Sequence, residues 1–269
     1  MAPPLPASTL GASAAAGGPS IVRVAGVTMR YANGVTALDG IDLDFPRGKL
    51  TTLLGPSGCG KTTLLKIIAD LLRPTTGTVA VNGAPVTGPG PERALVFQDF
   101  ALLPWATVLR NVAFGLELRG VAKSEREAIA AKYIREVGLA GFENQYPNQL
   151  SGGMRQRAGL ARALTVDAEI LMMDEPFSAV DEQMRRKLQE DLLALLAVEK
   201  KTVIVVTHSI EEAVYLSDRV VLLSRRPSRV SAIREPGLAH DMPPDQIRRD
   251  RRYLDTVDEI WDMLKQYLI

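Results

Sequence analysis

Residues 55–62 constrain this chain more than any other stretch of its sequence. They read GPSGCGKT, in which glycines recur before a lysine and a threonine. Glycine has no Cβ, so successive backbone N–H groups can turn toward phosphate oxygens, while Lys61 adds a mobile positive charge and Thr62 a hydroxyl for Mg²⁺. The pattern predicts a phosphate-binding P-loop. We assign to nucleotide binding Gly55, Pro56, Ser57, Gly58, Cys59, Gly60, Lys61, Thr62 and Thr63.

The sequence on either side supports this prediction. Residues 49–54, KLTTLL, read as a buried strand, and residues 62–72 carry apolar side chains at helical spacing. The loop would then join a buried strand to a helix N-terminus, which favours anions through its unpaired N–H groups and its dipole. The alternative is a glycine-rich turn between a strand and a helix that binds no ligand.

Composition limits the class of protein. The 269 residues, 46% of them hydrophobic, suit one α/β domain with a smaller subdomain. A net charge of +1 gives no overall attraction to nucleic acid, so we expect no nucleic-acid partner. The single cysteine, Cys59, excludes an intrachain disulfide and fits a reducing compartment. No apolar run reaches the roughly 18 residues of a membrane-spanning helix, so a membrane role would need a partner.

Hydrophobic patterning predicts an α/β fold, and with the P-loop this fold resembles the P-loop NTPase (RecA-like) type. Residues 21–45 alternate between apolar and polar in two stretches, which indicates an N-terminal antiparallel β subdomain. Later strands are continuous apolar runs, typical of a mostly parallel sheet covered on both faces. These runs are residues 94–97, 170–173, 202–206 and 220–223. Residues 107–118 and 124–137 instead read as helices that stop at Gly120 and Gly138, which predicts a helical subdomain insertion.

Composition also suggests where the extension, the domain and the tail of this chain begin and end. Residues 1–20, rich in Ala, Pro, Gly and Ser, are predicted to be a disordered extension rather than a signal peptide. Residues 21–233 form the predicted ATPase domain, with the helical subdomain at about 99–150. The tail, 234–269, ends in an amphipathic helix that we expect to dock on its own core rather than on a partner. Its predicted apolar face carries Leu254, Val257, Trp261, Leu264 and Leu268.

Two acidic residues follow a buried strand. Asp174 and Glu175 end the run 170–173, and ligands of open parallel sheets lie at the carboxyl ends of the strands. Asp174 is placed to hold Mg²⁺, directly or through water, and Glu175 to orient and deprotonate an attacking water. Alone, an Asp-Glu pair before Pro176 is a turn more often than a site, and the upstream P-loop favours the site.

The chain resembles the ATP-binding cassette (ABC) family, because further motifs follow in order. Residues 150–157, LSGGMRQR, resemble the family's signature motif. Ser151 has the character of a helix N-cap, and Gly152 and Gly153 expose the N-terminus of a helix that runs toward Leu164. A plain capped helix is the alternative. The resemblance implies that this second anion site binds the γ-phosphate of ATP held by another subunit, so that two chains sandwich two nucleotides.

The resemblance assigns other residues one at a time. Gln98 matches the family glutamine that senses the γ-phosphate, the metal and the attacking water, and His208 matches the switch histidine. Tyr31 matches the aromatic that stacks on adenine, although by pattern alone it is an alternating strand residue. Residues 178–181 resemble the loop that crosses the dimer, and Asp181 joins the nucleotide-binding set. The implied catalytic residues are Glu175, His208 and Gln98, and the implied metal ligands are Thr62, Gln98 and Asp174.

Asp70 departs from the family pattern, which typically has glycine there. We expect its negative charge to oppose the dipole at the helix C-terminus, at a cost of about 0.3–1 kcal/mol.

Residues 103–112, 173–177 and 226–230 resemble the nitrate, sulfonate and taurine importer ATPases. This implies ATP and Mg²⁺ as cofactors, a homodimer of ATPase subunits, an integral membrane permease and, indirectly, an extracytoplasmic solute-binding protein. It also implies a peripheral location on the cytoplasmic face of the inner membrane. Arg110 stands where this branch more often has an acid, in the part expected to face the permease. An exporter's ATPase and a soluble non-transport ABC ATPase are the alternatives, and the transported substrate is left open.

Overall fold

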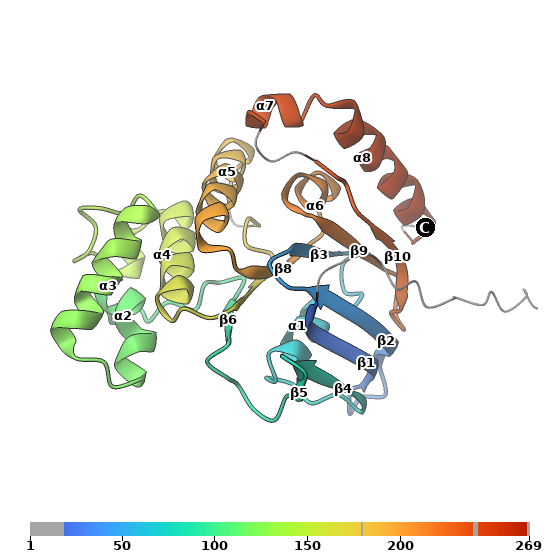
Figure 1. Ribbon diagram of the computed structural model, residues 1–269, viewed down its shortest axis with the longest axis horizontal. Helices are drawn as coiled ribbons and strands as arrows, with labels where there is room; N and C mark the ends of the chain where they lie inside the picture. The colour runs from blue at the N-terminus through green and yellow to red at the C-terminus, as the bar shows by residue number, and fades with distance from the viewer. Residues whose placement is uncertain (1–18, 179, 239–241, 268–269) are drawn as a thin grey trace, which may run out of the picture.

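Two β-sheets, with helices on both faces of the larger one, make up the structure (Figure 1). The computed structural model describes residues 19–178, 180–238 and 242–267. The strands are β1 (Ser20–Arg30), β2 (Thr36–Pro46), β3 (Leu50–Leu54), β4 (Thr76–Val81), β5 (Ala84–Pro85), β6 (Arg93–Val96), β7 (Ile170–Asp174), β8 (Thr202–Thr207), β9 (Arg219–Leu223) and β10 (Val230–Arg234). The helices are α1 (Lys61–Ile68), α2 (Val108–Leu118), α3 (Lys123–Glu136), α4 (Gly152–Thr165), α5 (Glu182–Glu199), α6 (Ile210–Leu216), α7 (Pro244–Ile247) and α8 (Arg251–Leu264), with short 3-10 turns η1 (Pro147–Gln149) and η2 (Lys265–Tyr267).

The smaller sheet is antiparallel, in the order β2-β1-β4-β5. The predicted antiparallel pair is confirmed as β1 and β2, and β1 begins at Ser20, one residue before the predicted start. The hairpin of β4 and β5 was not predicted. Its turn is Asn82-Gly83, with both residues at positive φ (51° and 78°), the conformation for which Asn-Gly is the strongest short-range signal.

The larger sheet runs in the order β10-β9-β3-β8-β7-β6, and only β10 is antiparallel to its neighbour. Its strands are buried on both faces, as the continuous apolar runs predict. Along β7, Leu171 and Met173 pack toward the helices α2–α6, while Ile170 and Met172 pack toward α1 and the smaller sheet. Each such buried side chain contributes about 1.5–3 kcal/mol of hydrophobic stabilisation.

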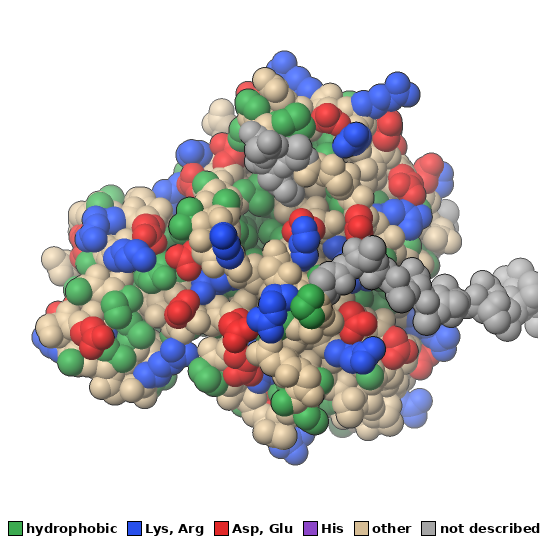
Figure 2. Space-filling view, viewed as in Figure 1, with side chains coloured by type: hydrophobic (Ala, Val, Ile, Leu, Met, Phe, Trp, Pro, Cys, Tyr) green, Lys and Arg blue, Asp and Glu red, His purple; other side chains and the backbone are tan. Residues whose placement is uncertain are grey.

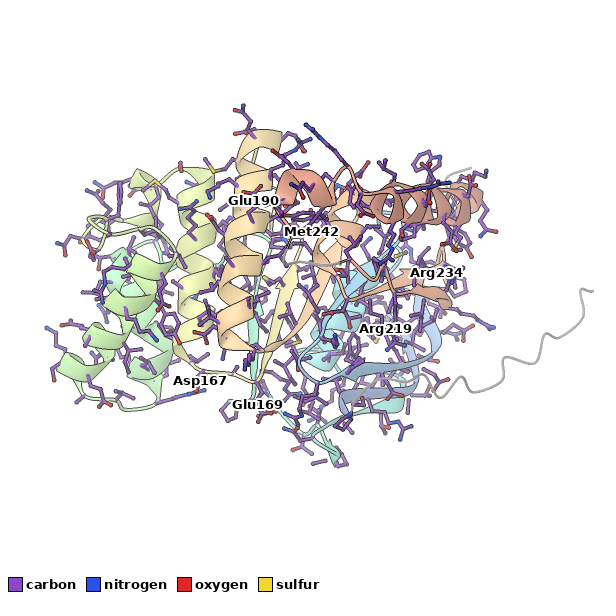
Figure 3. The ribbon with its side chains drawn as sticks, turned by 45° about the horizontal axis from the view of Figure 1, so that its top comes forward. Asp167, Glu169, Glu190, Arg219, Arg234 and Met242 are labelled. Atoms are coloured by element: carbon purple, nitrogen blue, oxygen red, sulfur yellow. The ribbon has the colours of Figure 1, made fainter. Side chains whose placement is uncertain are left out.

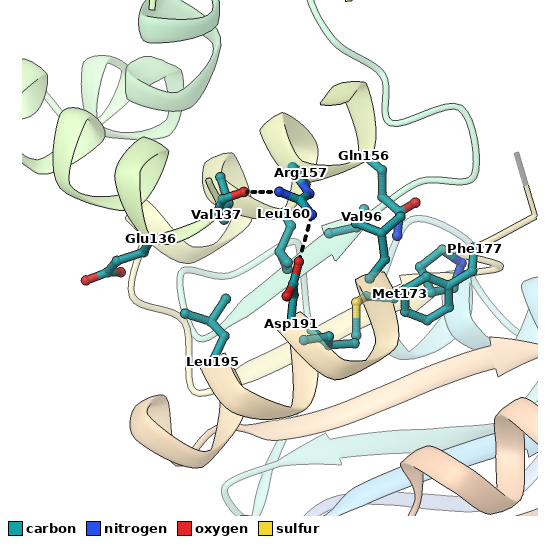
Figure 4. Close-up of a pocket in the computed structure, with 13 residues that line it drawn as sticks. Val96, Glu136, Val137, Gln156, Arg157, Leu160, Met173, Phe177, Asp191 and Leu195 are labelled. Carbon is teal, nitrogen blue, oxygen red and sulfur yellow. Dashed lines mark hydrogen bonds and ion pairs between the residues drawn. The ribbon is translucent and has the colours of Figure 1, made fainter. Parts of the chain in front are cut away.

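The helices α2, α3 and α4 form a group beside the β6 edge of the sheet (Figure 1). The predicted helices are confirmed as α2 and α3, and Gly120 and Gly138 follow their ends at φ 74° and 70°. Because α4 packs against α2 and α3, this helical group extends beyond residue 150. Arg157 of α4 ties it to the core, donating to the Val137 carbonyl at 3.1 Å and to the Asp191 carboxylate of α5 at 2.7 Å (Figure 4).

The tail helix α8 docks on α6 of its own core, as expected, through a face that includes Val257 and Leu264 of the predicted one but is rotated away from the rest. The buried residues of α8 are Tyr253, Ile260 and Leu264, whereas Leu254 and Trp261 are 50% and 52% exposed. The predicted and observed stripes share the same helical spacing, and only the shape of the surface beneath selects between them. Leu268, the last residue of the predicted face, lies outside the described residues.

A charged pair holds the same tail to the sheet edge. Arg234 of β10 lies beside α8 (Figure 3), and its Nε donates to Glu259 at 2.7 Å. Both groups are partly exposed, so this pair stabilises the docking by about 1 kcal/mol or less.

The first helix ends earlier than predicted, which changes the interpretation of Asp70. Helix α1 stops at Ile68 rather than at residue 72, and Asp70 adopts a left-handed φ of 54°. Its N–H donates to the Ile67 carbonyl at 3.0 Å, and the next N–H reaches back to Lys66 at 2.9 Å. Asp70 therefore lies just past the helix cap, where glycine is favoured because it has no Cβ, so the backbone gives a reason for glycine here that the dipole argument did not include.

We predict opposite effects for two substitutions at Asp70. Asp70→Gly should raise the free energy of unfolding by about 0.5–1 kcal/mol, because glycine adopts positive φ without strain, and Asp70→Ala should lower it by about 1 kcal/mol. Urea denaturation followed by circular dichroism measures both. If both variants were stabilised, the negative charge rather than the backbone conformation would be the source of the cost.

Candidate functional site

Parallel register brings the predicted site residues to one edge of the larger sheet. Leu54, the last residue of β3, pairs with Thr207 at the end of β8, and Val206 pairs with Asp174 at the end of β7. The three strands therefore end at the same level. The P-loop, the acidic pair and His208 leave the sheet side by side, at the carboxyl edge where ligands of such sheets bind.

At two glycines of the P-loop, neighbouring atoms lie too close to the backbone to leave room for a side chain. A Cβ on Gly55 would lie 2.7 Å from the Leu223 carbonyl oxygen, and one on Gly60 would lie 2.9 Å from a Leu38 methyl group. Gly60 also has φ 114°. No side chain caps the N-terminus of α1, so its first N–H groups face the loop, an arrangement that fits a phosphate group.

The ammonium group of Lys61 lies inside the curve of the loop. The residue is buried, and its Nζ donates to the carbonyl oxygens of Gly55 at 2.7 Å and of Pro56 at 3.0 Å. Neither partner carries a negative charge, so a phosphate oxygen at this point would meet a buried, uncompensated cation. Burial raises the pKa of the nearby Cys59 thiol, which fits the interpretation of this cysteine as a packing residue.

Thr62 and Asp174 meet across the two strand ends. The Thr62 hydroxyl donates to Oδ1 of Asp174 at 2.9 Å. Asp174 is buried, which raises the pKa of its carboxyl, and the hydrogen bond from Thr62 opposes that shift. A hydroxyl and a carboxylate oxygen are ligands that Mg²⁺ prefers, so this pair fits the predicted metal site.

Glu175 has an unusual backbone conformation. Its φ of 47° lies in the left-handed region, and its N–H donates to the Val206 carbonyl at 2.9 Å. The conformation turns the carboxylate out of the strand toward the His208 imidazole, with Oε2 3.3 Å from Nδ1. Such strain costs roughly 1–2 kcal/mol and persists where the surrounding structure holds it, typically at functional sites.

Tyr31 reaches the nucleotide loop from the smaller sheet. Its hydroxyl shares a hydrogen bond with the Thr63 hydroxyl at 2.9 Å, and its ring is partly exposed. The predicted adenine platform therefore lies beside the first turn of α1.

The signature residues form a separate site. The Ser151 hydroxyl caps α4 by accepting the Met154 N–H at 3.3 Å, as predicted. Gly152 is the first residue of α4, and a Cβ on Gly153 would come within 3.3 Å of Met184 on α5. Among the described residues, no hydrogen bond or ion pair joins this helix N-terminus to the P-loop of the same chain.

Two further predicted residues make no contact with the P-loop here. Asp181 caps α5, with Oδ1 accepting the Met184 N–H at 3.0 Å. Residue 179, which belongs to the same predicted loop (178–181), lies outside the described ranges. Gln98 lies in the turn two residues after β6, exposed, and its side chain has no hydrogen bond to any residue that the structure describes. Gln98 lies at the same carboxyl edge of the sheet as Asp174, because β6 and β7 run parallel.

Two charged residues near the site were missed. The Arg226 guanidinium lies 3.6 Å from the position that a Cβ on Gly58 would take, and Glu212 lines a pocket with Glu175 and His208. Arg226 belongs to residues 226–230, which carried part of the resemblance, but nothing in that pattern indicated the P-loop as its neighbour.

Comparisons with known proteins agree with this geometry. A family model described as ABC transporter matches residues 38–178. The uncharacterized ABC transporter ATP-binding protein MJ0412 of Methanocaldococcus jannaschii is 52% identical, over 88% of this chain and 87% of its own length. The taurine import ATP-binding protein TauB of Yersinia pestis bv. Antiqua is 47% identical, over 78% of this chain and 82% of its own.

Solved structures share the fold, which confirms the predicted class. The dimeric structure of MJ0796, a bacterial ABC transporter cassette, matches with a TM-score of 0.72 and 32% identity, over 80% of this chain and 98% of that one. Another structure of MJ0796 is a dimeric post-hydrolysis state bound to ADP and Pi. The cbiO1 protein of Clostridium perfringens, with a TM-score of 0.74 over 89% of this chain and 95% of its own, is 23% identical and supports the fold alone.

We predict that Lys61→Ala weakens ATP binding by about 30-fold or more, because charge-assisted hydrogen bonds contribute about 1.5–3 kcal/mol each. Titration with a fluorescent ATP analogue measures the affinity. Lys66→Ala, an exposed lysine on the same helix, is the matched control and should bind like the unmodified chain. Equal affinities for the two variants would contradict a phosphate contact by Lys61.

Proposed function

The chain belongs to the ABC transporter ATP-binding proteins, whose cassette hydrolyses ATP, and on that premise we propose that it energises uptake of a small anion or organic solute through a separate membrane permease. The observation that carries this proposal is the edge of the larger sheet, where the P-loop, Asp174, Glu175 and His208 come together. The importer assignment rests on the similarity to taurine import ATP-binding proteins at 44–47% identity. A substrate of the nitrate, sulfonate or taurine type is consistent with it.

The first step is nucleotide binding. The N–H groups of the P-loop and the Lys61 ammonium bind the phosphates, and Tyr31 stacks on the adenine ring. Thr62, Asp174 and Gln98 would hold Mg²⁺. When bound, Mg²⁺ neutralises charge on the phosphate oxygens and stabilises the charge of the transition state.

The second step is closure of two copies. The capped N-terminus of α4 suits an anion and, in the part of the chain that the structure describes, has no hydrogen bond to its own P-loop, which supports its use by a second copy. Ser151, Gly152 and Gly153 of one subunit then contact the γ-phosphate bound by the other, and Asp181 lies in the loop that crosses between them. Dimeric structures of the related MJ0796 cassette are consistent with this arrangement.

The third step is hydrolysis. Glu175 accepts a proton from the attacking water, whose oxygen bonds to the γ-phosphorus as the bond to the bridging oxygen of ADP breaks. General-base assistance of this kind is worth about 10²–10⁴-fold in rate. His208 and Gln98 stabilise the charge that builds on the γ-phosphoryl oxygens, and release of phosphate allows the two copies to separate.

The helical part of the chain is the surface we assign to the permease. Trp105, just before α2, is 70% exposed, and Leu118, the last residue of α2, is 72% exposed. Hydrophobic side chains also gather over the α2 and α3 region in Figure 2. Within the described residues, no helix is both long and apolar enough to cross a bilayer. We therefore propose a peripheral position on the cytoplasmic face of the inner membrane, with the solute-binding protein outside.

We predict that a gentle-detergent pull-down of the tagged chain from its native membranes recovers a polytopic permease together with a soluble solute-binding protein. Mass spectrometry identifies both, and the ligand of the binding protein names the substrate. Recovery of a soluble partner alone would contradict the transport proposal. A permease recovered without any binding protein, in repeated preparations, would favour export over import.

We predict that Glu175→Gln retains ATP binding but loses turnover by at least about 100-fold, because the amide cannot accept a proton. The ATP-bound variant should then elute as a dimer in size-exclusion chromatography. Glu169→Gln, at the opposite end of β7 and half exposed, is the control and should hydrolyse normally. Normal turnover by Glu175→Gln would remove this residue from the role of general base.

A further inference from the structure

Arg226 lies in a loop that leaves the larger sheet beside the P-loop. The loop, residues 224–229, joins β9 to β10 and contains three arginines. Because β9 is parallel to β3, with Leu54 opposite Leu222, this loop and the P-loop emerge at the same edge of the sheet. The strands β9 and β8 flank β3, so the loop and His208 approach the P-loop from opposite sides.

Hydrogen bonds fix the position of this loop. Ser228 is buried, its N–H donates to the Ala37 carbonyl at 3.0 Å, and its carbonyl accepts the Asp39 N–H at 3.0 Å. The Ser228 hydroxyl donates to the Ser224 carbonyl at 3.1 Å and closes the turn. Ala37 and Asp39 belong to β2, the strand that follows Tyr31, the residue predicted to stack on adenine. The loop is therefore anchored on the side of the P-loop where the adenine ring is expected.

The three arginines of the loop differ in their partners. Nε of Arg225 donates to the Tyr267 carbonyl of the tail, and the Arg229 guanidinium pairs with Asp39 at 2.6 Å. Arg226 is exposed, and its guanidinium has no hydrogen bond or ion pair to any residue that the structure describes. In the described part of the chain, Arg226 is therefore the arginine of this loop that is left to bind another molecule.

The Arg226 guanidinium reaches the P-loop at Gly58. Its Nη2 lies 3.6 Å from the position that a Cβ on Gly58 would take, and Gly58 has φ 72°. Burial raises the pKa of the Cys59 thiol, and the positive charges of Lys61 and Arg226 oppose that rise, so the charge of Arg226 acts inside the loop. Neither cation pairs with a carboxylate among the described residues, and two like charges at one loop repel each other. A bound polyanion would compensate both charges.

We propose that Arg226 binds the phosphates of the nucleotide that are retained in ADP, from the side of the P-loop opposite to the proposed general base. A guanidinium donates two parallel hydrogen bonds to phosphate oxygens. The exposed side chain can turn across Gly58, because glycine places no side chain between it and the N–H groups of the loop. Glu175 and His208 are assigned to the γ-phosphate on the other side of β3, so Arg226 should act on ATP and ADP alike. The inference rests on nucleotide binding at the P-loop.

The test is the affinity of the full-length chain for a fluorescent ADP and for a fluorescent, non-hydrolysable ATP analogue, measured by titration. Arg226→Gln should weaken the binding of both about fivefold to tenfold, because an exposed charge-assisted pair is removed while the P-loop stays intact. Arg226→Lys keeps the charge and should bind both within about threefold of the unmodified chain. Arg225→Gln, which removes the same charge from the neighbouring residue, is the matched control and should bind both within about twofold.

Unchanged affinity of Arg226→Gln for both nucleotides would overturn the inference, and so would an equal loss in Arg225→Gln, which would indicate a general effect of charge. A loss for ATP alone would also contradict it, because Arg226 would then act at the γ-phosphate or on a second copy of the chain. If Arg226→Gln does not fold, Arg226→Ala decides by the same criteria.

Lys61→Ala in the same titrations separates the two claims. If Lys61→Ala loses binding while Arg226→Gln binds normally, only the role of Arg226 is overturned. Normal binding by both variants would overturn the nucleotide site itself.

Discussion

The in-register ending of β3, β8 and β7 is the constraint on which the site depends. Leu54 pairs with Thr207, and Val206 with Asp174, so three connections leave the sheet at one level. Parallel pairing requires a crossover between strands, and here each crossover returns the chain to the same edge. A slip of one residue in β7 would point Asp174 to the other face of the sheet and separate it from Thr62.

Much of this fold could be predicted because its signals are local. A strand buried on both faces must be apolar throughout, and the runs that became β7 and β8 show this directly. The strand β4 escaped prediction because half of it is exposed, so it carries little hydrophobic pattern, although the Asn82-Gly83 pair marks its turn. For the tail helix, docking on its own core was predicted correctly, but its buried face was predicted only in part. Two apolar stripes with equivalent spacing overlap on α8, and the surface of α6 selects between them.

The same distinction between local and long-range signals applies to the residues of the site. Residues whose role depends on the chain beside them, such as Lys61 in its loop or Ser151 at its helix, are predictable from motifs. Arg226 and Glu212 are not, because neighbours come from distant segments: β9 lies against β3, and Glu212 of α6 lines one pocket with Glu175 from the end of β7. Sequence spacing carries no information about a contact that two separate crossovers create.

Two residues with strained backbone conformations, one at the site and one away from it, show which strain concerns chemistry. Asp70 and Glu175 both have left-handed φ, at 54° and 47°, and both therefore cost stability relative to glycine. At Asp70 the side chain makes no contact that uses its charge among the described hydrogen bonds and ion pairs, so glycine would serve better. At Glu175 the same conformation turns a carboxylate toward His208, and glycine would remove the group that the strain positions. The buried carboxyl of Glu212 in the same pocket, whose Oε1 has no hydrogen-bond partner among the described residues, is a second cost that packing does not explain. Two destabilising features that converge on one pocket are better explained by chemistry than by chance, whereas a single strained turn elsewhere is not.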